Sequence, residues 1–389
     1  MMPLLIIYPF YNQKPLMDIL AGKLKEKGLL IDILCLNNGD LISRSDVRWP
    51  QDALLVLQKS YSQTNSRLSR IRSIYLRIIF AVKYFHNVAK EYQLIDFHSF
   101  NSLEYMFLIS ICRNNAIPYD ITLWGSDVLR AADKTFKKRK KFYLGSRCIK
   151  GSDTTIDVLR KHYGVLLKDK LRVCYFGNSE LDYIDGLSEI KYSDILKSMI
   201  PCKSNKIIVV CGYNNQRAQQ HQIMLEAIKQ LDDCIKNKIH IVLPLTYPLK
   251  DHYIIEVKDM AELTGVSYTV LERFLTNDEL AALRKASDIT VNIQITDSFS
   301  SAIQSHLYCQ NVVILGEWLN YPLYNKSDVF CIRTSLPDLS NTIKDAIEHL
   351  EEYKIKSLPN KKKISEMSSW DYRIMEWTQI YYDIADKVV

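Results

Sequence analysis

The sequence predicts an α/β protein of two domains, each built on a parallel β-sheet with helices on both faces. Short apolar runs that read as buried strands alternate with segments of helical spacing, which is the pattern of a doubly wound, Rossmann-like sheet. This alternation starts twice, with a polar stretch between the two series. The chain has 389 residues, more than the ~250–300 at which a single core stops growing.

The first series spans residues 1–180, the predicted N-terminal domain. Its strand-like runs lie at 4–10, 30–36, 53–58, 94–100, 119–125, near 147, and at 170–177. Helical segments lie between them, among them one that starts at Pro15 and others at 67–85, 101–115 and 153–163. Strands that are joined through helices run parallel, so we expect one parallel sheet here.

The second series spans residues 205–365, the predicted C-terminal domain, after a polar linker at 181–204. Its strand-like runs lie at 206–213, 238–247, 267–274, 288–294, 311–316 and 328–334. Its helical segments lie at 219–232, 249–263, 276–287 and 300–309. Residues 366–389 are aromatic and amphipathic, and we expect a helix that packs back toward the N-terminal domain. Two such sheets would face a cleft, because ligands bind beyond the carboxyl ends of parallel strands.

The cysteines and the hydropathy of the chain indicate in which compartment the protein is expected. Nine cysteines without a CxxC pair predict reduced thiols rather than a disulfide framework. The apolar N-terminus lacks a basic leader, and no segment reaches the ~18 apolar residues of a membrane-spanning helix. We expect a cytoplasmic protein, either free or resting on the inner face of the cell membrane.

Positive charge is concentrated in the first half. Residues 1–180 carry 28 Lys and Arg against 16 Asp and Glu, whereas 181–389 carry 23 against 28. The segment 67–85 has an apolar helical stripe with arginines elsewhere around it, and it is either a core helix or a surface for anionic lipid. The segment 134–142 has six basic residues, and it is either a solvated face or a patch for anionic lipid or a charged acceptor. No RNA-recognition motif accompanies these runs, so we expect no nucleic acid.

Candidate site residues, most of them polar, follow the ends of strands in both series. In the first series they are His98, Trp124, Gly125, Ser126 and Asp127. In the second they are Gly212, Asn214, Arg217, His221, Thr246, Tyr247, Asp297, Ser298, Ser300 and Ser301. Each has a structural alternative: His98 could be a hydrogen-bonded structural residue, Asp127 could cap a helix starting near Val128, and 296–301 could cap the helix at 300–309. Their joint placement at strand ends nevertheless predicts ligand sites.

This lining suits a nucleoside diphosphate sugar. The diphosphate gains negative charge as it leaves, so a site needs N–H donors at a helix N-terminus and a fixed cation. Ser300 and Ser301 would supply the first, with Arg217 and His221 opposite. No DxD near a strand end and no His/Cys/carboxylate cluster predicts a metal, so we expect a reaction without a metal or other cofactor. In the N-terminal domain, Asp127 or His98 would accept a hydroxyl proton.

Three segments carry a resemblance to a known family. The segment 296–322 resembles the donor-binding segment of bacterial glycosyltransferases with the GT-B fold, especially family-4-like enzymes of surface polysaccharide assembly. The segment 209–231 resembles their phosphate-binding loop and helix, and 122–130 looks like a loop of their first domain. The segment 240–248 is similar to transferases that add fucosamine-type sugars to lipid-linked carriers. The resemblance places Gln304 where the family usually has a glutamate that binds the ribose, so the charge-assisted bond is lost.

The resemblance implies a glycosyltransferase of bacterial cell-surface glycan synthesis. The donor would be held by residues 206–330 and a lipid-linked or polysaccharide acceptor by 1–180. Thr246 and Tyr247 would form part of the nucleotide pocket, and Asp127 would be the base if the reaction inverts configuration. Two alternatives remain: a nucleotide-sugar epimerase, which needs no acceptor, and a non-catalytic protein that binds anionic lipid or glycan.

Overall fold

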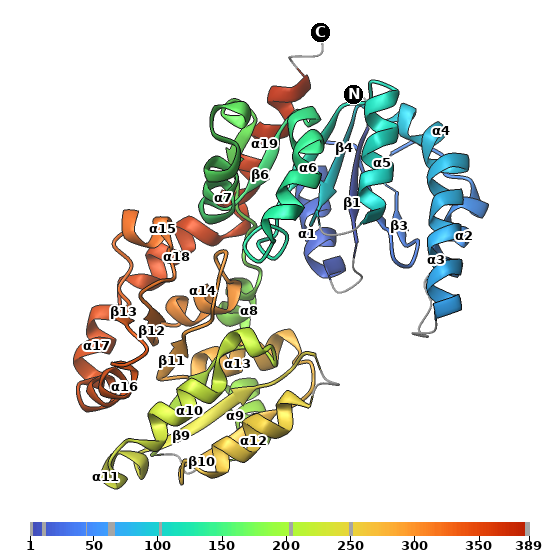
Figure 1. Ribbon diagram of the computed structural model, residues 1–389. Coiled ribbons are helices and arrows are strands. Elements are labelled where there is room, and N and C mark those ends of the chain that lie inside the picture. Colours follow the sequence, from blue (N-terminus) through green and yellow to red (C-terminus); the bar gives the residue numbers. More distant parts are fainter. Residues whose placement is uncertain are drawn as a thin grey trace. The chain divides into compact units, whose positions relative to one another are not determined.

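The computed structural model describes the chain except for residues 1–2, 10–12, 44, 61–66, 101–102, 202–204, 249–251 and 386–389. The chain divides into two compact units, Met1–Tyr175 with Ile374–Val389, and Phe176–Arg373 (Figure 1). The sequence predicted an N-terminal domain ending at residue 180 and a separate C-terminal helix. In the structure the division between the units falls inside that helix, α19 (Trp370–Ala385).

The first unit is built on a seven-stranded sheet in the order β3-β2-β1-β4-β5-β6-β7. Its strands are β1 (Leu4–Tyr8), β2 (Ile31–Cys35), β3 (Leu41–Ile42), β4 (Leu94–His98), β5 (Tyr119–Thr122), β6 (Ile149–Gly151) and β7 (Leu171–Val173). All neighbours pair in parallel except β3, a two-residue strand that pairs antiparallel with β2. The strand order reverses between β1 and β4, but residues 10–12 and 101–102, near the ends of these two strands, lie outside the described chain.

Helices cover both faces of this sheet. They are α1 (Lys14–Glu26), α2 (Gln51–Ser60), α3 (Arg67–Ile79), the π-helical turn Phe80–Phe85, α4 (His86–Val88), α5 (Leu103–Asn114), α6 (Asp133–Gly145) and α7 (Asp153–Tyr163). Successive residues of a strand point to opposite faces. Phe97 of β4 contacts Tyr105 of α5, with ring centroids 5.3 Å apart, whereas its neighbour Asp96 accepts a hydrogen bond from Tyr381 of α19. Helices α5 and α19 therefore cover opposite faces.

The run 53–58, predicted as a strand, is helical, and the prediction is wrong there. It lies inside α2, which directly follows Pro50. Ala53, Leu57 and Ser60 are buried and share one helical face, while Leu55 is exposed. A short apolar run has no periodicity long enough to separate a strand from a buried helical face.

The second unit is built on a six-stranded, all-parallel sheet in the order β10-β9-β8-β11-β12-β13. Its strands are β8 (Ile207–Cys211), β9 (Ile239–Pro244), β10 (Ser267–Leu271), β11 (Ile289–Asn292), β12 (Val312–Gly316) and β13 (Ile332–Thr334). These strands fall within the predicted runs. Both units are doubly wound parallel sheets, as the sequence predicts.

The helices of the second unit surround this sheet. They are α8 (Glu180–Gly186), α9 (Glu189–Met199), α10 (His221–Lys229), α11 (Asp233–Lys236), α12 (Tyr253–Glu262), α13 (Asn277–Ala286), α14 (Ser301–Tyr308), α15 (Pro322–Lys326), α16 (Leu339–Glu348), α17 (Leu350–Ser357) and α18 (Asn360–Ser368). The stretch 181–204, expected to be a linker, forms α8 and α9 in its described part. Leu181 and Ile184 of α8 share a buried apolar cluster with Ala281 and Ala282 of α13.

The described residues contain neither a disulfide nor a cluster of metal ligands nor a membrane-spanning helix. The eight cysteines described there are free thiols. No group of three or more His, Cys, Asp or Glu side chains in that part of the chain is placed to hold a metal ion. Within the same residues, no helix combines the length and the apolar character needed to cross a membrane.

Candidate functional site

The carboxyl ends of β8 and β11 form the candidate site of the second unit. These strands are neighbours, and the strand order reverses between them, with β9 and β10 beyond one and β12 and β13 beyond the other. Ligands of open parallel sheets bind outside the carboxyl ends of strands at such a reversal. The loop 212–215 follows β8 and the loop 293–298 follows β11, so both lie at this point.

Gly212 allows the first loop to pass close to α10. Its φ is +68°, and a Cβ atom here would lie 2.8 Å from His221 Nε2 and 3.1 Å from Gln219 Oε1. His221 is fully buried, and its Nδ1 lies 3.3 Å from the hydroxyl of Tyr253. Burial lowers the pKa of His221 to about 4, so the ring is neutral near pH 7. His221 therefore offers a diphosphate a hydrogen bond rather than a positive charge.

Buried polar atoms without a partner gather at this edge. Within the described chain, those that lack a hydrogen bond include Asn215 Oδ1, His221 Nε2, Asn292 Oδ1 and Nδ2, Gln294 Nε2, Thr296 Oγ1 and Gln304 Oε1. Leaving one such atom unpaired costs roughly 1–3 kcal/mol, and folded proteins pair most of them. A polar ligand would supply these atoms with partners. We call these four side chains, the amides of Asn292, Gln294 and Gln304 and the imidazole of His221, the open amide cluster.

Neighbouring side chains hold the cluster in place. The Gln294 Oε1 accepts hydrogen bonds from the Tyr213 hydroxyl and from Gln219 Nε2, both at 3.0 Å. Gln219 also accepts from the Tyr213 backbone N–H at 3.3 Å. The amide plane of Gln294 is thereby fixed, and its side chain also helps to lower the pKa of the Asp297 carboxyl against the effect of burial.

The loop before α14 is tightly organised by Asp297. Its carboxylate accepts the backbone N–H of Ser298 at 2.8 Å and of Ser300 at 3.2 Å, and also the Tyr321 hydroxyl. Burial raises the pKa of Asp297, and these hydrogen bonds partly oppose the rise. Phe299 has a φ of +83°, a sparsely populated region for a residue with a side chain. Asp297 therefore shapes the N-terminus of α14.

Two predicted donor residues lie on α14 itself. Ser301 begins the helix and is exposed. Gln304 is buried, and its Nε2 donates to the Phe299 carbonyl at 2.9 Å. Its Oε1 has no partner in the described chain and can accept a hydroxyl hydrogen bond.

Arg217, the predicted diphosphate cation, is engaged elsewhere. Its guanidinium forms a two-point ion pair with Glu256 and lies 4.6 Å from the centroid of the Tyr253 ring. The side chain is more than half exposed, at 58%. It would have to leave Glu256 to bind a diphosphate.

The predicted nucleotide residues follow β9. Thr246 is buried, and the Tyr247 hydroxyl accepts a hydrogen bond from Asn214 Nδ2 at 3.2 Å. The Tyr247 ring stacks on Phe274, with centroids 5.9 Å apart and planes 3° apart. Phe274 is exposed, so one aromatic face is available next to the strand ends.

In the first unit, Asp127 is a buried carboxylate bound by backbone amides. It accepts the N–H of Trp124 at 3.0 Å and of Phe100 at 3.1 Å, and so joins the loops after β4 and β5. Burial raises its pKa, and the amide hydrogen bonds oppose that rise. No helix begins at Val128, where residues 126–130 form turns, so the cap interpretation is wrong. Gly125 adopts a φ of +102° in this turn.

His98 is also paired on both ring nitrogens. Its Nε2 lies 3.2 Å from Asp96 Oδ2, and its Nδ1 accepts from Trp124 Nε1 at 3.4 Å. The ring is fully buried and stacks on Trp377. Ser126, by contrast, is exposed. The residues predicted for the acceptor side thus lie together, but Asp127 and His98 are turned into the protein.

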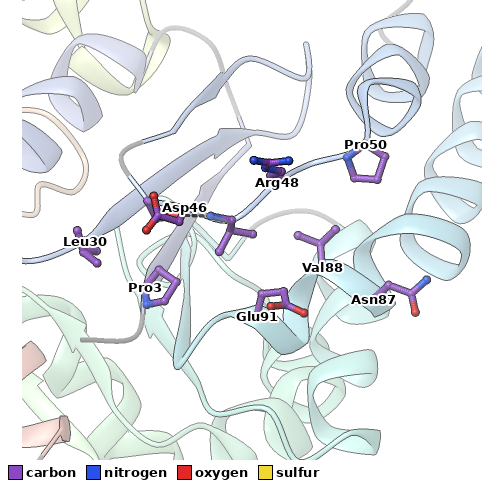
Figure 2. A pocket seen from close by; sticks show the side chains of 10 residues that line it. Pro3, Leu30, Asp46, Arg48, Pro50, Asn87, Val88 and Glu91 are labelled. Atoms are coloured by element: carbon purple, nitrogen blue, oxygen red, sulfur yellow. Dashed lines mark hydrogen bonds between the residues drawn. The ribbon is translucent and has the colours of Figure 1, made fainter.

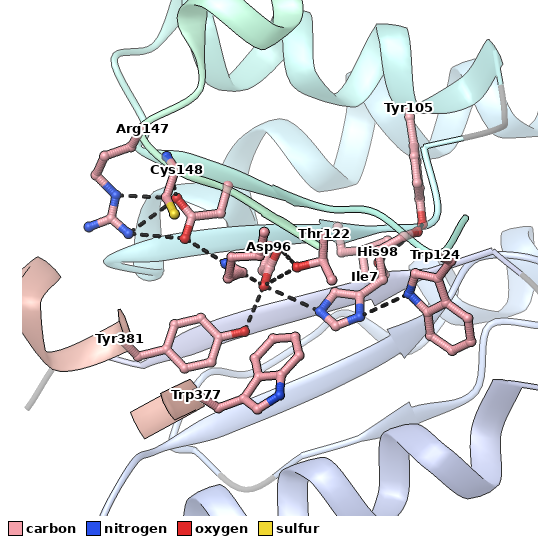
Figure 3. Close-up of polar contacts among 12 residues, drawn as sticks. Ile7, Asp96, His98, Tyr105, Thr122, Trp124, Arg147, Cys148, Trp377 and Tyr381 are labelled. Carbon is pink, nitrogen blue, oxygen red and sulfur yellow. Dashed lines mark hydrogen bonds and ion pairs between the residues drawn. The ribbon is translucent and has the colours of Figure 1, made fainter. Parts of the chain in front are cut away.

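Figure 3 shows that His98 belongs to a buried network of charged side chains. Asp96 and Asp120 lie opposite each other on β4 and β5, and the Lys150 ammonium lies 2.9 Å from the first and 2.7 Å from the second. Tyr381 donates to Asp96 at 2.6 Å. Burial opposes ionisation of Asp96, but Lys150, His98 and Tyr381 together outweigh it and hold the pKa of Asp96 below its ordinary value. The network has no exposed member among Asp96, Asp120 and Lys150.

Two cavities bear on the choice of site. One of about 430 Å³ lies at the carboxyl edge of the second sheet, lined by Gln220, Ile295, Glu317, Trp318, Leu336 and Pro337. The other, of about 630 Å³, is shown in Figure 2 and includes Pro3 and Leu30, which precede β1 and β2. It therefore lies at the amino ends of these strands, the wrong edge for a ligand of a doubly wound sheet.

Sequence reasoning missed three side chains of the candidate site: Asn292, Gln294 and Gln219. A signal for the first two was present, because they are two residues apart at the end of an apolar strand and so share one face. Gln219 had no such signal. Its contact with Gln294 joins residues that are 75 positions apart.

Comparison with known proteins identifies the fold. No protein-family model and no curated protein matches the sequence. A glycosyltransferase from Rickettsia africae ESF-5 is similar in structure, with a TM-score of 0.72 and 12% identity over 99% of each chain. HepE of Anabaena, in complex with UDP and glucose, has a TM-score of 0.69 and 12% identity over 100% of each chain. Sucrose-phosphate synthase from Thermosynechococcus elongatus has a TM-score of 0.69 and 11% identity over 100% of each chain. The chain has the two-domain Rossmann-like fold of these proteins, the GT-B fold.

Proposed function

We propose that this chain is a glycosyltransferase that moves a sugar from a nucleotide donor to an acceptor hydroxyl. The observation that carries the proposal is the open amide cluster at the strand reversal between β8 and β11. Such atoms suit the many oxygens of a nucleoside diphosphate sugar. HepE, a protein of the same fold, was solved with UDP-glucose, which supports the same class of donor here.

In this proposal the second unit binds the donor. Ser301, at the N-terminus of α14, faces the diphosphate through its backbone N–H, and Ser300, whose N–H is bound by Asp297, faces it through its hydroxyl. His221 Nε2 adds a neutral hydrogen bond. Gln304 Oε1 accepts a ribose hydroxyl. Thr246 and Tyr247 line the nucleotide pocket. Transfer proceeds without a metal ion.

The first unit binds the acceptor, a lipid-linked or polysaccharide hydroxyl of bacterial cell-surface glycan synthesis. Trp124 and Ser126 are the accessible members of the predicted acceptor residues. Asp127 fixes the loops that carry them. The buried positions of Asp127 and His98 favour a role in positioning over direct proton transfer.

Gly212 provides a sharp test of the donor site. Gly212→Ala would place a methyl group against His221 and strain a positive φ, so nucleotide-sugar affinity should fall at least tenfold in isothermal titration with UDP-, GDP- and ADP-sugars. Gly186→Ala is the matched control, because a Cβ there meets nothing within 4 Å and its φ is not positive. Equal donor affinity in the two variants would contradict the site.

Product analysis separates the remaining functions. A transferase turns over only when donor and acceptor are both present. Isomers formed from donor alone would show an epimerase. Binding of the donor without any turnover, across a panel of lipid-linked and polysaccharide acceptors, would show a binding protein.

A further inference from the structure

Helix α3 and the π-helical turn after it expose an apolar stripe to solvent. Its members are between 40% and 68% exposed, and they are Ile71, Ile74, Tyr75, Ile78 and Val82. Their spacing places them along one side of the helix. The alternative that these residues form a core helix is therefore wrong. Phe80, Ala81 and Phe85 make the core contacts of this segment instead.

A cavity of about 350 Å³ lies beside this stripe. It is lined by eight apolar side chains and one arginine, namely Leu36, Leu57, Ile74, Ile78, Phe80, Ala81, Phe107, Leu108 and Arg77. Ile74 and Ile78 belong both to the stripe and to the cavity. Phe107, on α5, is 55% exposed at its rim. The volume and lining are those of a pocket for an apolar ligand with one polar anchor.

The cavity reaches the carboxyl edge of the first sheet. Leu36 directly follows β2, and its N–H donates to the carbonyl of Tyr8, the last residue of β1. The loops that carry Trp124 and Ser126 leave the same edge after β5. The cavity and the predicted acceptor loops thus belong to the same edge of the sheet, with β1 and β4 between β2 and β5.

The segment 67–85, which supplies five of the cavity's lining residues, carries charge of one sign. Residues 67–85 contain five Lys or Arg and no Asp or Glu. Arg77 lines the cavity, and its guanidinium donates to Asn37 Oδ1 at 3.2 Å. Arg72 and Lys83 are exposed on the same segment. An apolar stripe flanked by cations is the pattern of a helix that lies at an anionic lipid interface.

We propose that this cavity binds one aliphatic chain of an amphiphile with a phosphate head group, with Arg77 contacting the phosphate. A peptide is a poorer occupant, because its backbone amides would enter a lining in which Arg77 is the single polar side chain, and unpaired amides are costly. The inference rests on the proposed function in one respect: the amphiphile would be the lipid part of the acceptor.

Titration calorimetry with the purified full chain tests the cavity without any sugar donor. The probes are decyl phosphate, decyl maltoside as a chain without charge, and inorganic phosphate as a head without a chain. We expect decyl phosphate to bind at least tenfold more tightly than either. Ala81→Met, which fills the cavity, and Phe107→Ser, at its exposed rim, should each weaken decyl phosphate at least fivefold. Arg77→Gln should remove the preference for decyl phosphate over decyl maltoside.

Several results would overturn the proposal. Unchanged decyl phosphate affinity in both Ala81→Met and Phe107→Ser would place the amphiphile elsewhere. If inorganic phosphate bound as tightly as decyl phosphate, the aliphatic chain would contribute nothing and the site would be only a cationic surface. A dimer by sedimentation that Ile74→Glu dissociates would assign the stripe to a second copy. Nucleotide-sugar affinity, measured on the same variants, should stay unchanged. The proposal of the lipid site can therefore fail without the proposal of the donor site failing, and the reverse.

Discussion

The carboxyl edges of the two sheets carry similar polar residues but use them in opposite ways. In the first unit, Asp127 and His98 are buried with every acceptor engaged by backbone amides or neighbouring side chains. In the second unit, Asn292 is equally buried, yet neither atom of its amide has a partner in the described chain. A paired polar group strengthens the fold, whereas an unpaired one weakens it and is available to a ligand. Whether a buried polar group has a hydrogen-bond partner, more than its residue type, distinguishes a structural residue from a candidate ligand-binding residue.

The largest effect should come from breaking the paired network of the first unit. Lys150→Met leaves Asp96 and Asp120 buried without their shared cation, and should lower the free energy of unfolding by about 3–5 kcal/mol. Chemical denaturation measures this. Lys161→Met, at an exposed position of α7, is the control and should change stability by less than about 0.5 kcal/mol. A Lys150→Met protein as stable as this control would show that the network is not structural.

A change of pH should act on the second unit through His221. Its pKa is about 4 in the fold against an ordinary 6.5, so the unfolded chain binds more protons between these values. The contribution of His221 to the free energy of unfolding is therefore fully present above pH 6.5. It is lost as the pH drops toward 4, by up to roughly 3 kcal/mol. His221→Gln should flatten the pH dependence of the melting temperature in that range. The exposed His252→Gln should not, and equal slopes in all three proteins would count against a buried neutral ring.

Asn292→Val should change stability and binding in opposite directions. Removing an unpaired buried amide should raise the free energy of unfolding by about 1 kcal/mol, while nucleotide-sugar affinity falls at least tenfold. Asn311→Val is the matched control, because its amide donates to the Arg284 carbonyl at 2.9 Å and its loss should destabilise by about 1–3 kcal/mol. The control should bind donor normally. If Asn292→Val loses stability as Asn311→Val does, its amide has a partner in the free protein.

Asp127→Asn tests positioning against proton transfer. The amide keeps one oxygen for the N–H groups of Trp124 and Phe100, so we expect stability to fall by about 1 kcal/mol and kcat by less than about tenfold, with KM for the acceptor raised. Steady-state kinetics at saturating donor measure this. A loss of 10² or more in kcat at unchanged stability would instead make Asp127 the general base.

The smallest effect should come from chelation. Turnover with EDTA should match turnover without it, because the sequence has no DxD near a strand end. Restoration of lost activity by Mg²⁺ or Mn²⁺ after chelation would overturn this prediction.

Strand periodicity alone predicts most of the fold. The long alternating series placed every strand of the two sheets except the two-residue β3, and it placed Gly212 directly after an apolar strand. The run 53–58 was misread because six residues do not contain a full helical period. The segment 67–85 was correctly predicted to be helical. Helical spacing shows which residues share one face, but it does not show whether that face is buried or exposed.

By itself, the sequence determined the two doubly wound sheets and the loops that follow their strands, because strand ends follow from local apolar patterns. Tertiary structure decided which polar residues at those positions are available. Asp127 is paired with Phe100 from another loop, Gln294 is held by Gln219 from another strand end, and Asn292 has no partner in the described chain. Such pairing depends on contacts between distant segments, and local pattern carries no information about them.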